Sequence, residues 1–167
     1  MKTGLERIRE HMAEYLAQQG VNAVTAWPGQ ERKYLNEPVV VVSLRGCQAG
    51  PAGFQDYLGE RFNEETGLWE ELYGRKAVLT FGLDLYAAPE SSGADLQQAF
   101  HRLAQALTMG SPEGLQVQEF SCGETEYDEK ARLHRRKAQA VCTAYLYAVA
   151  QTGDEFLDFE LRGGLKQ

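Results

Sequence analysis

One segment of the sequence, GRKAVLTFGLDLYAAP at residues 74–89, constrains the fold more than any other. Apolar side chains recur at every second position, the period of a β-strand, and they fill one face: Ala77, Leu79, Phe81, Leu83 and Leu85. The opposite face is only half polar. A strand from Arg75 to Ala87 would extend about 43 Å at ~3.3 Å per residue, whereas a compact chain of this size is about 40 Å across. We therefore expect this strand to cross the whole domain or to project beyond it.

A second long strand is predicted from Arg136 to Gln151. Small side chains fill one of its faces, which suits the close approach of a helix. The other face carries larger side chains: Val141, Thr143, Tyr145, Tyr147 and Val149. Shorter strands are predicted at Asn22–Trp27, Pro38–Arg45 and Leu115–Cys122, with a last one in DEFLDFELR. The four consecutive valines of PVVVVSLR indicate a strand covered on both faces.

Two amphipathic helices are predicted. The first begins at a capping box formed by Thr3 and Glu6 and ends at Gly20. Its apolar stripe is Leu5, Ile8, Met12, Tyr15 and Leu16. The second begins at Ser92, with Asp95 three residues later, and stops before Gly110 and Pro112. Its apolar stripe is Leu96, Ala99, Phe100, Leu103 and Leu107.

The order of these elements predicts an α+β fold, because strands that follow one another without intervening helices pair antiparallel. We expect a mixed, mainly antiparallel sheet with two long strands and a projecting hairpin or loop, packed against two α-helices. The 167 residues fit a single domain, 1–167, with an inserted hairpin or loop at 46–74 and a C-terminal strand and tail at 152–167.

The glycine- and aromatic-rich segment 46–74 has two interpretations. It is an irregular hairpin packed on its own sheet, or it is a mobile loop that becomes ordered on a partner. The hairpin is favoured as the local structure. Aromatic side chains would face the partner in the second interpretation: Phe54, Tyr57, Phe62, Trp69 and Tyr73.

Two helices cover one side of such a sheet, and no third long helix is predicted for the other side. Either the sheet curls and buries its second face within the chain, or that face is a subunit interface. The second alternative assigns Val141, Thr143, Tyr145, Tyr147 and Val149 to the interface. Tyrosines suit partly hydrated contacts of this kind.

Charge and hydropathy exclude several classes of function. A net charge of −7 argues against a dedicated nucleic-acid-binding protein, since phosphate contacts require a basic surface. No apolar run approaches the roughly 20 residues that cross a bilayer, and the charged, helical N-terminus does not resemble a secretion signal. We therefore expect a cytoplasmic protein without membrane contacts. The three cysteines, Cys47, Cys122 and Cys142, are expected to be buried free thiols.

No motif for catalysis, cofactor binding or metal binding is found in the sequence. The chain lacks the nucleophile, phosphate-loop, dinucleotide-binding and zinc-protease patterns. His11, His101 and His134 are scattered and are expected at the surface. We therefore expect no enzymatic activity, no catalytic residue, no cofactor and no metal, although a small enzyme with a site assembled from distant residues stays an alternative.

An acidic run, ETEYDEK, directly precedes a basic run, ARLHRRK. One interpretation is a salt-bridged turn between neighbouring strands, each exposed pair contributing only tenths of a kcal/mol, about 0.2–1. The other is that the acidic patch of one subunit, with Glu126 and Asp128, faces the basic patch of the next, with Arg135 and Arg136. The basic run is alternatively a binding patch for an anionic partner.

The order of segments resembles that of phage tail terminator proteins, the tail-completion and head–tail joining proteins of tailed phages and prophages. The resemblance covers roughly residues 3–150 and rests on VNAVTAW, PVVVVSLRG, LYGRKAVLTFGLDLYAAP and ADLQQAFHRLAQAL, followed by LQVQEFSCGETEYDEKARLHRRKAQAVCTAYLYA. It implies a subunit that forms a closed ring, possibly a hexamer, which terminates the tail tube and contacts the tail tube protein and the head connector protein. Its location would be the cytoplasm during assembly and then the tail of a virion or phage-like particle. Another tail component, in the tube or near the baseplate, is the related alternative.

Overall fold

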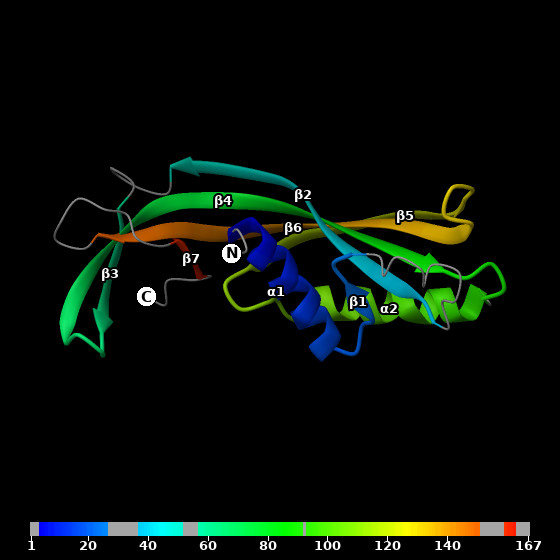
Figure 1. Ribbon diagram of the computed structural model, residues 1–167, viewed down its shortest axis with the longest axis horizontal. Coiled ribbons are helices and arrows are strands. Elements are labelled where there is room, and N and C mark those ends of the chain that lie inside the picture. The colour runs from blue at the N-terminus through cyan, green and yellow to red at the C-terminus, as the bar shows by residue number, and fades with distance from the viewer. Residues whose placement is uncertain (1–3, 27–36, 52–56, 92, 151–158, 163–167) are drawn as a thin grey trace.

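The computed structural model describes residues 4–26, 37–51, 57–91, 93–150 and 159–162, and in 146–150 and 159–162 it describes the backbone. These residues form two helices and seven strands (Figure 1), in the order α1 (Gly4–Gln18), β1 (Ala23–Val24), β2 (Val39–Pro51), β3 (Tyr57–Asn63), β4 (Leu68–Ala87), α2 (Gly93–Met109), β5 (Gln116–Asp128), β6 (Leu133–Ala150) and β7 (Phe159–Arg162). The fold is α+β, as the sequence predicted. None of the described helices is long and apolar enough to cross a membrane.

A single sheet forms the body of the molecule. Its strands lie in the order β1-β2-β4-β6-β5, while β3 pairs with the beginning of β4 and β7 pairs with the end of β6. Among the strands that the structure describes, the short β1–β2 pair is parallel and the other pairs are antiparallel. The prediction of a mixed, mainly antiparallel sheet is therefore confirmed.

Both helices cover the same face of this sheet (Figure 1). The alternating residues of β4 from Ala77 to Leu85 are at most 1% exposed and pack against Met12 and Leu16 of α1 and Leu103 of α2. The Tyr15 hydroxyl of α1 donates a hydrogen bond to the Ala106 carbonyl of α2 at 2.7 Å, which ties the two helices together. The main core thus lies between one face of the sheet and the two helices.

The end of α1 follows from Gly20. This residue has a φ of 82°, a conformation that glycine adopts without a steric penalty. The Val21 amide donates to the Leu16 carbonyl at 2.9 Å, and the Gly20 amide donates to the Ala17 carbonyl at 3.1 Å. These two bonds are the Schellman pattern that satisfies the last carbonyls of a helix. The predicted stop at Gly20 is therefore confirmed.

The long strands are longer than the sequence predicted. β4 has 20 residues and begins at Leu68, β2 continues past Arg45 to Pro51, and β5 continues to Asp128. Apolar alternation marks only the part of each strand that lies under the helices. The remaining parts are held by backbone pairing, which leaves no hydropathy signal.

Several smaller expectations were wrong. Leu5 is 48% exposed and is not part of the buried stripe. It lies in the first turn of α1, and the buried residues of this helix begin at Ile8. Cys47 and Cys122 are exposed rather than buried, since they lie on the outer parts of β2 and on the edge strand β5, and only Cys142 is buried. The expected strand at Asn22–Trp27 is limited to Ala23–Val24 within the described residues. Thr3 and Ser92, the predicted helix caps, lie outside the described residues.

Candidate interaction surface

A hairpin projects from one end of the sheet, beyond the two helices (Figure 1). It consists of β3, a four-residue turn and the first part of β4, and residues 57–73 are called the arm below. The structure thus confirms that segment 46–74 contains a projecting hairpin. Seven large hydrophobic side chains are strongly exposed among the described residues, and four of them lie on this arm: Tyr57, Phe62, Leu68 and Trp69. Exposed apolar side chains gathered in one place are typical of an interaction surface.

Asn63 and Gly67 define the turn at the tip of the arm. The Asn63 side-chain oxygen accepts hydrogen bonds from the amides of Glu65 at 2.9 Å and Thr66 at 3.3 Å. The Gly67 amide donates to the Asn63 carbonyl at 2.8 Å, and Gly67 has a φ of 68°. Asparagine and glycine are suited to these two roles, since a short amide mimics a backbone turn and glycine accepts the left-handed conformation.

One face of the arm is aromatic. Phe62 lies opposite Trp69 and Tyr57 lies opposite Tyr73, and each pair is edge-to-face with ring centroids 5.5 Å apart. Trp69 is 68% exposed and Phe62 is 49% exposed. Because side chains alternate along β4, this face continues the face that the helices cover from Ala77 onward. The arm therefore prolongs the sheet past the point where its own helices protect it.

Two carboxylates lie between the aromatic pairs. Glu60 is directly opposite Glu71, an arrangement of like charges that destabilises a sheet. The Tyr73 hydroxyl donates to the Glu71 carboxylate at 2.7 Å, and this bond is the main reason why the pKa of Tyr73 is raised. Partial desolvation, followed by the charges of Glu60 and Glu71, raises the pKa of Tyr57. Among the described residues, neither carboxylate forms an ion pair with a lysine or arginine.

On the opposite face of the arm, the negative charge of Glu70 is balanced by a neighbouring arginine. The Glu70 carboxylate accepts hydrogen bonds from Arg61 Nε at 3.0 Å and from Asn63 Nδ2 at 2.7 Å. Glu70 is thus neutralised within the hairpin, whereas Glu60 and Glu71 are not. The aromatic face consequently combines exposed rings with negative charge, a combination that suits a cationic side chain of a partner.

The predicted partner-facing residues are largely brought together by the arm. Tyr57, Phe62, Trp69 and Tyr73 share its aromatic face, while Phe54 lies outside the described residues. Glu60 and Glu71 were not singled out in the sequence. The signal that identifies them is the turn motif NEETG between two short aromatic segments, because it fixes which residues lie opposite one another.

The face of the sheet away from the helices, called the open face below, holds the predicted interface residues Val141, Thr143 and Tyr145. All three are half-buried, and most of their cross-strand neighbours are polar, such as Thr80, Glu119 and Gln116, while Val78 opposite Thr143 is apolar. For Tyr147 and Val149 the structure describes the backbone alone. At the end away from the arm, Val39, Tyr86 and Leu133 form a small second core on this face. The open face is therefore less apolar than the sequence suggested.

The predicted charge patches are the two strands of one hairpin, β5 and β6. Glu126 lies directly opposite Arg135 within the same chain. Arg135 Nη1 is 3.3 Å from Asp128 Oδ2, and Arg135 Nε is 4.0 Å from Asp84 Oδ2. The pKa of Asp128 is lowered, chiefly by the hydrogen bond that its carboxylate accepts from the Ala131 amide. The Lys130 amide and the Arg135 side chain lower it further, while partial desolvation acts in the opposite direction.

Arg136 does not share a patch with Arg135. Adjacent residues of a strand point to opposite faces, and Arg136 turns toward α2, where its guanidinium lies 3.9 Å from the centre of the Phe100 ring. Its Nε also donates to the Gly123 carbonyl at 3.0 Å. The two arginines are thus committed within the chain, on different faces, so the interpretation of a salt-bridged hairpin fits the structure better than a joint basic patch.

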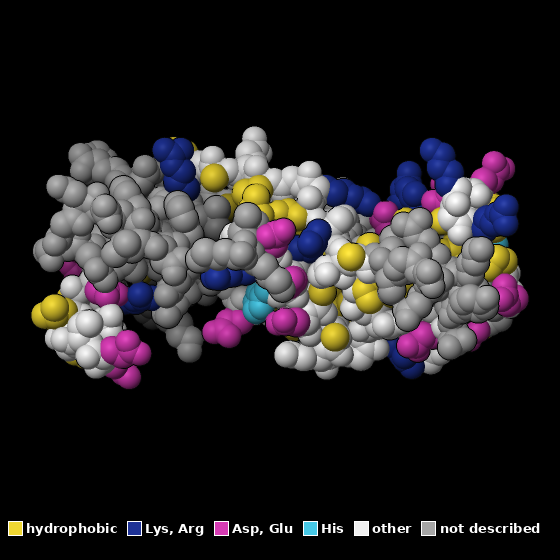
Figure 2. All heavy atoms as spheres, viewed as in Figure 1, with side chains coloured by type: hydrophobic (Ala, Val, Ile, Leu, Met, Phe, Trp, Pro, Cys, Tyr) yellow, Lys and Arg dark blue, Asp and Glu magenta, His cyan; other side chains and the backbone are white. Residues whose placement is uncertain are grey.

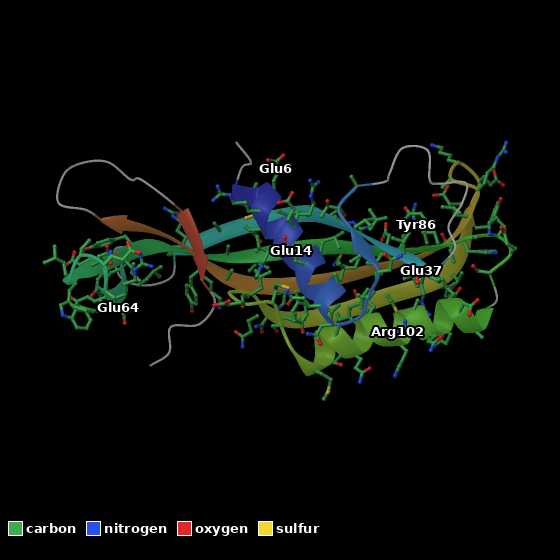
Figure 3. All side chains as sticks on the ribbon, turned by 60° about the horizontal axis from the view of Figure 1, so that its bottom comes forward. Glu6, Glu14, Glu37, Glu64, Tyr86 and Arg102 are labelled. Carbon is green, nitrogen blue, oxygen red and sulfur yellow. The ribbon has the colours of Figure 1, made fainter. Side chains whose placement is uncertain are left out.

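A cleft of about 530 Å³ lies between the end of α1, β2 and α2, and Glu37 and Arg102 at its border are labelled in Figure 3. Among its described lining residues there is no serine, cysteine or histidine. His11 bonds the Glu113 carbonyl at 2.5 Å, and His134 stacks edge-to-face on Tyr127. In the described part of the chain, no three His, Cys, Asp or Glu side chains are grouped to hold a metal ion.

Comparison with known proteins identifies no family: no protein-family model matches the chain, and no curated protein matches it at a significant level.

Proposed function

We propose that this protein is a structural subunit that assembles with copies of itself into a ring, and that the ring terminates a phage-type tail tube and joins it to the head connector. The arm is the observation that carries this proposal. It extends the sheet beyond its helices and exposes four of the seven strongly exposed large hydrophobic side chains among the described residues. A contact made by such a protruding element with a different surface of the next copy is heterologous, and heterologous contacts close into rings or run on as filaments.

The resemblance to tail terminator proteins supplies the second part of the proposal. The layout of elements on which it depends, a long-stranded sheet with a hairpin after β2 and two helices, is the layout of this fold. The role requires neither a catalytic group nor a cofactor. The tail tube protein and the head connector protein are the partners that this role implies.

Purification of the full chain tests the proposal directly. Multi-angle light scattering should give one defined oligomer, and electron microscopy should show closed rings. Adding the protein to a polymerising tail tube protein should cap the tubes and shorten them. Open-ended polymers of the chain alone would favour a tube component instead, and a strictly monomeric protein with no effect on tube length would overturn the proposal.

A further inference from the structure

We propose that the arm of one copy receives the β5–β6 turn of the next copy, with Arg132 and Lys130 of that turn between the carboxylates and rings of the arm. The inference rests on the self-assembly proposed above, and it adds the two surfaces that meet. The turn consists of residues 129–132, between Asp128 and Leu133, which pair with each other.

The β5–β6 turn and the tip of the arm are built in the same way. In each, four residues separate a closing pair, and the first residue of that pair, Asp128 or Asn63, accepts two backbone amides with its side-chain oxygen. The last residue of each turn has the left-handed backbone conformation. In the arm this position is Gly67, with a φ of 68°, and in the other turn it is Arg132, with a φ of 54°.

Arg132 is therefore placed where glycine fits best, and it is the only described residue other than glycine with a positive φ. Its side chain is exposed, and neither Arg132 nor Lys130 has an ion-pair or hydrogen-bond partner for its side chain among the described residues. Glu129 is the one acidic residue of the turn, so these four residues carry a net positive charge. An arginine at a strained position, with no partner among the described residues of its own chain, indicates a contact outside that chain.

The arm has the complementary chemistry. Glu60 and Glu71 oppose each other, and no cation from the described side chains lies between them. A guanidinium between them would remove that repulsion while its plane lies on the exposed Trp69 or Phe62 ring. Residues 57–73 hold five glutamates and one arginine, and that arginine is already bonded to Glu70. Charge complementarity thus favours this turn over the open face, where Arg135 is already paired.

The two surfaces lie toward opposite ends of the long axis (Figure 1). In Figure 2 acidic and hydrophobic side chains are visible at the tip of the arm, and lysines and arginines, with some acidic side chains among them, stand out at the other end. A single chain cannot bring its own ends together, but successive copies can, head to tail. The contact is heterologous, as a ring requires.

Charge reversal tests the contact without relying on loss of function alone. One variant carries E60K and E71K, so that both its arm and its turn are basic, and the other carries K130E and R132E, so that both are acidic. Sedimentation velocity should show each variant alone as a monomer, and an equimolar mixture should assemble, because every contact in an alternating assembly then joins opposite charges. R132G should weaken assembly of the otherwise wild-type chain about tenfold or more, as expected for loss of a charge-assisted contact.

Matched controls separate position from net charge. E64Q with E65Q removes two acidic charges from the turn of the same arm, where Figure 3 labels Glu64 at the outer end, and R7Q removes a cation from α1. Both should assemble like the wild type, and circular dichroism should confirm that all variants are folded. If the wild type assembles and the two charge-reversed variants also assemble alone, this inference is overturned while the proposed function stands. A monomeric wild type would overturn this inference, and it would overturn the proposed function as well if the protein also leaves the length of the tail tubes unchanged.

Discussion

The conformation of Arg132 allows a prediction about the stability of the monomer, measured at a protein concentration below that at which copies assemble. Arg132 has a φ of 54°, where a residue with a β-carbon is less stable than glycine by about 1–2 kcal/mol. Glycine in turn makes the unfolded chain more flexible, which offsets about 0.4–1 kcal/mol of that gain. The Arg132 side chain has no ion pair among the described residues, so its removal costs little. We therefore expect R132G to raise the free energy of unfolding by roughly 0.5–1 kcal/mol, and Tm by about 2–3 °C for a chain of this length.

Arg132→Ala is the matched comparison, because alanine removes the same charge but keeps the β-carbon. It should unfold like the wild-type monomer and be less stable than R132G by about 0.5–1 kcal/mol. Neither variant carries the charge, so the comparison is not affected by differences in assembly. The reciprocal change, Gly67→Ala in the arm, places a β-carbon at a φ of 68° and should lower stability by a similar amount.

Urea unfolding followed by tryptophan fluorescence and far-UV circular dichroism measures these differences as shifts in midpoint at constant slope. An R132A variant as stable as R132G, or more stable, would show that position 132 is not strained in the way that its φ indicates. A Gly67→Ala variant without any loss would refute the same reasoning for the arm.

Three further predictions concern the core, the pH response and the thiols. Phe81 is 0% exposed at the centre of β4, and Phe81→Ala should destabilise the fold by about 3–5 kcal/mol in urea unfolding, whereas a loss below 1 kcal/mol would contradict its place in the core. Because the pKa of Asp128 is lowered in the folded state, its carboxylate stabilises the fold at pH values above the ordinary aspartate pKa of 3.8. This contribution is lost as the pH falls through the lower pKa of the folded state. Tm should therefore fall more steeply with acidification in the wild type than in D128N. Burial raises the pKa of Cys142 to about 12, whereas Cys47 and Cys122 are exposed. An aromatic disulfide reagent at neutral pH should therefore modify Cys47 and Cys122 quickly and Cys142 only on unfolding. Fast reaction of all three thiols would contradict the structure.

The part of the fold under the helices could be predicted because burial leaves a pattern in the sequence. Residues 77–85 of β4 alternate since one side of the strand faces the helices, and Gly20 marks the end of α1 since no other residue adopts its φ as easily. Outside the helices this pattern ends. The true start of β4 at Leu68 is set by pairing with β3, which needs only backbone groups.

The candidate site could be predicted less completely, because its composition depends on the pairing register of the strands. The aromatic residues of the arm could be found by composition, but the opposition of Glu60 and Glu71 depends on which residues face each other across the hairpin. The adjacency of Arg135 and Arg136 in the sequence suggests a single basic patch, but adjacent residues of a strand point to opposite faces. A basic run on a strand is thus divided between two environments.

Strand β4 gives the arm its direction. It runs without interruption from Leu68 in the arm to Ala87 beneath the helices, and its pairing with β6 already begins at Glu71. The rings and carboxylates of the arm therefore lie on a strand whose other half is in the most buried part of the molecule. A surface that is oriented before it meets its partner loses little conformational entropy on binding, so a small contact at the tip can hold neighbouring copies at a fixed angle.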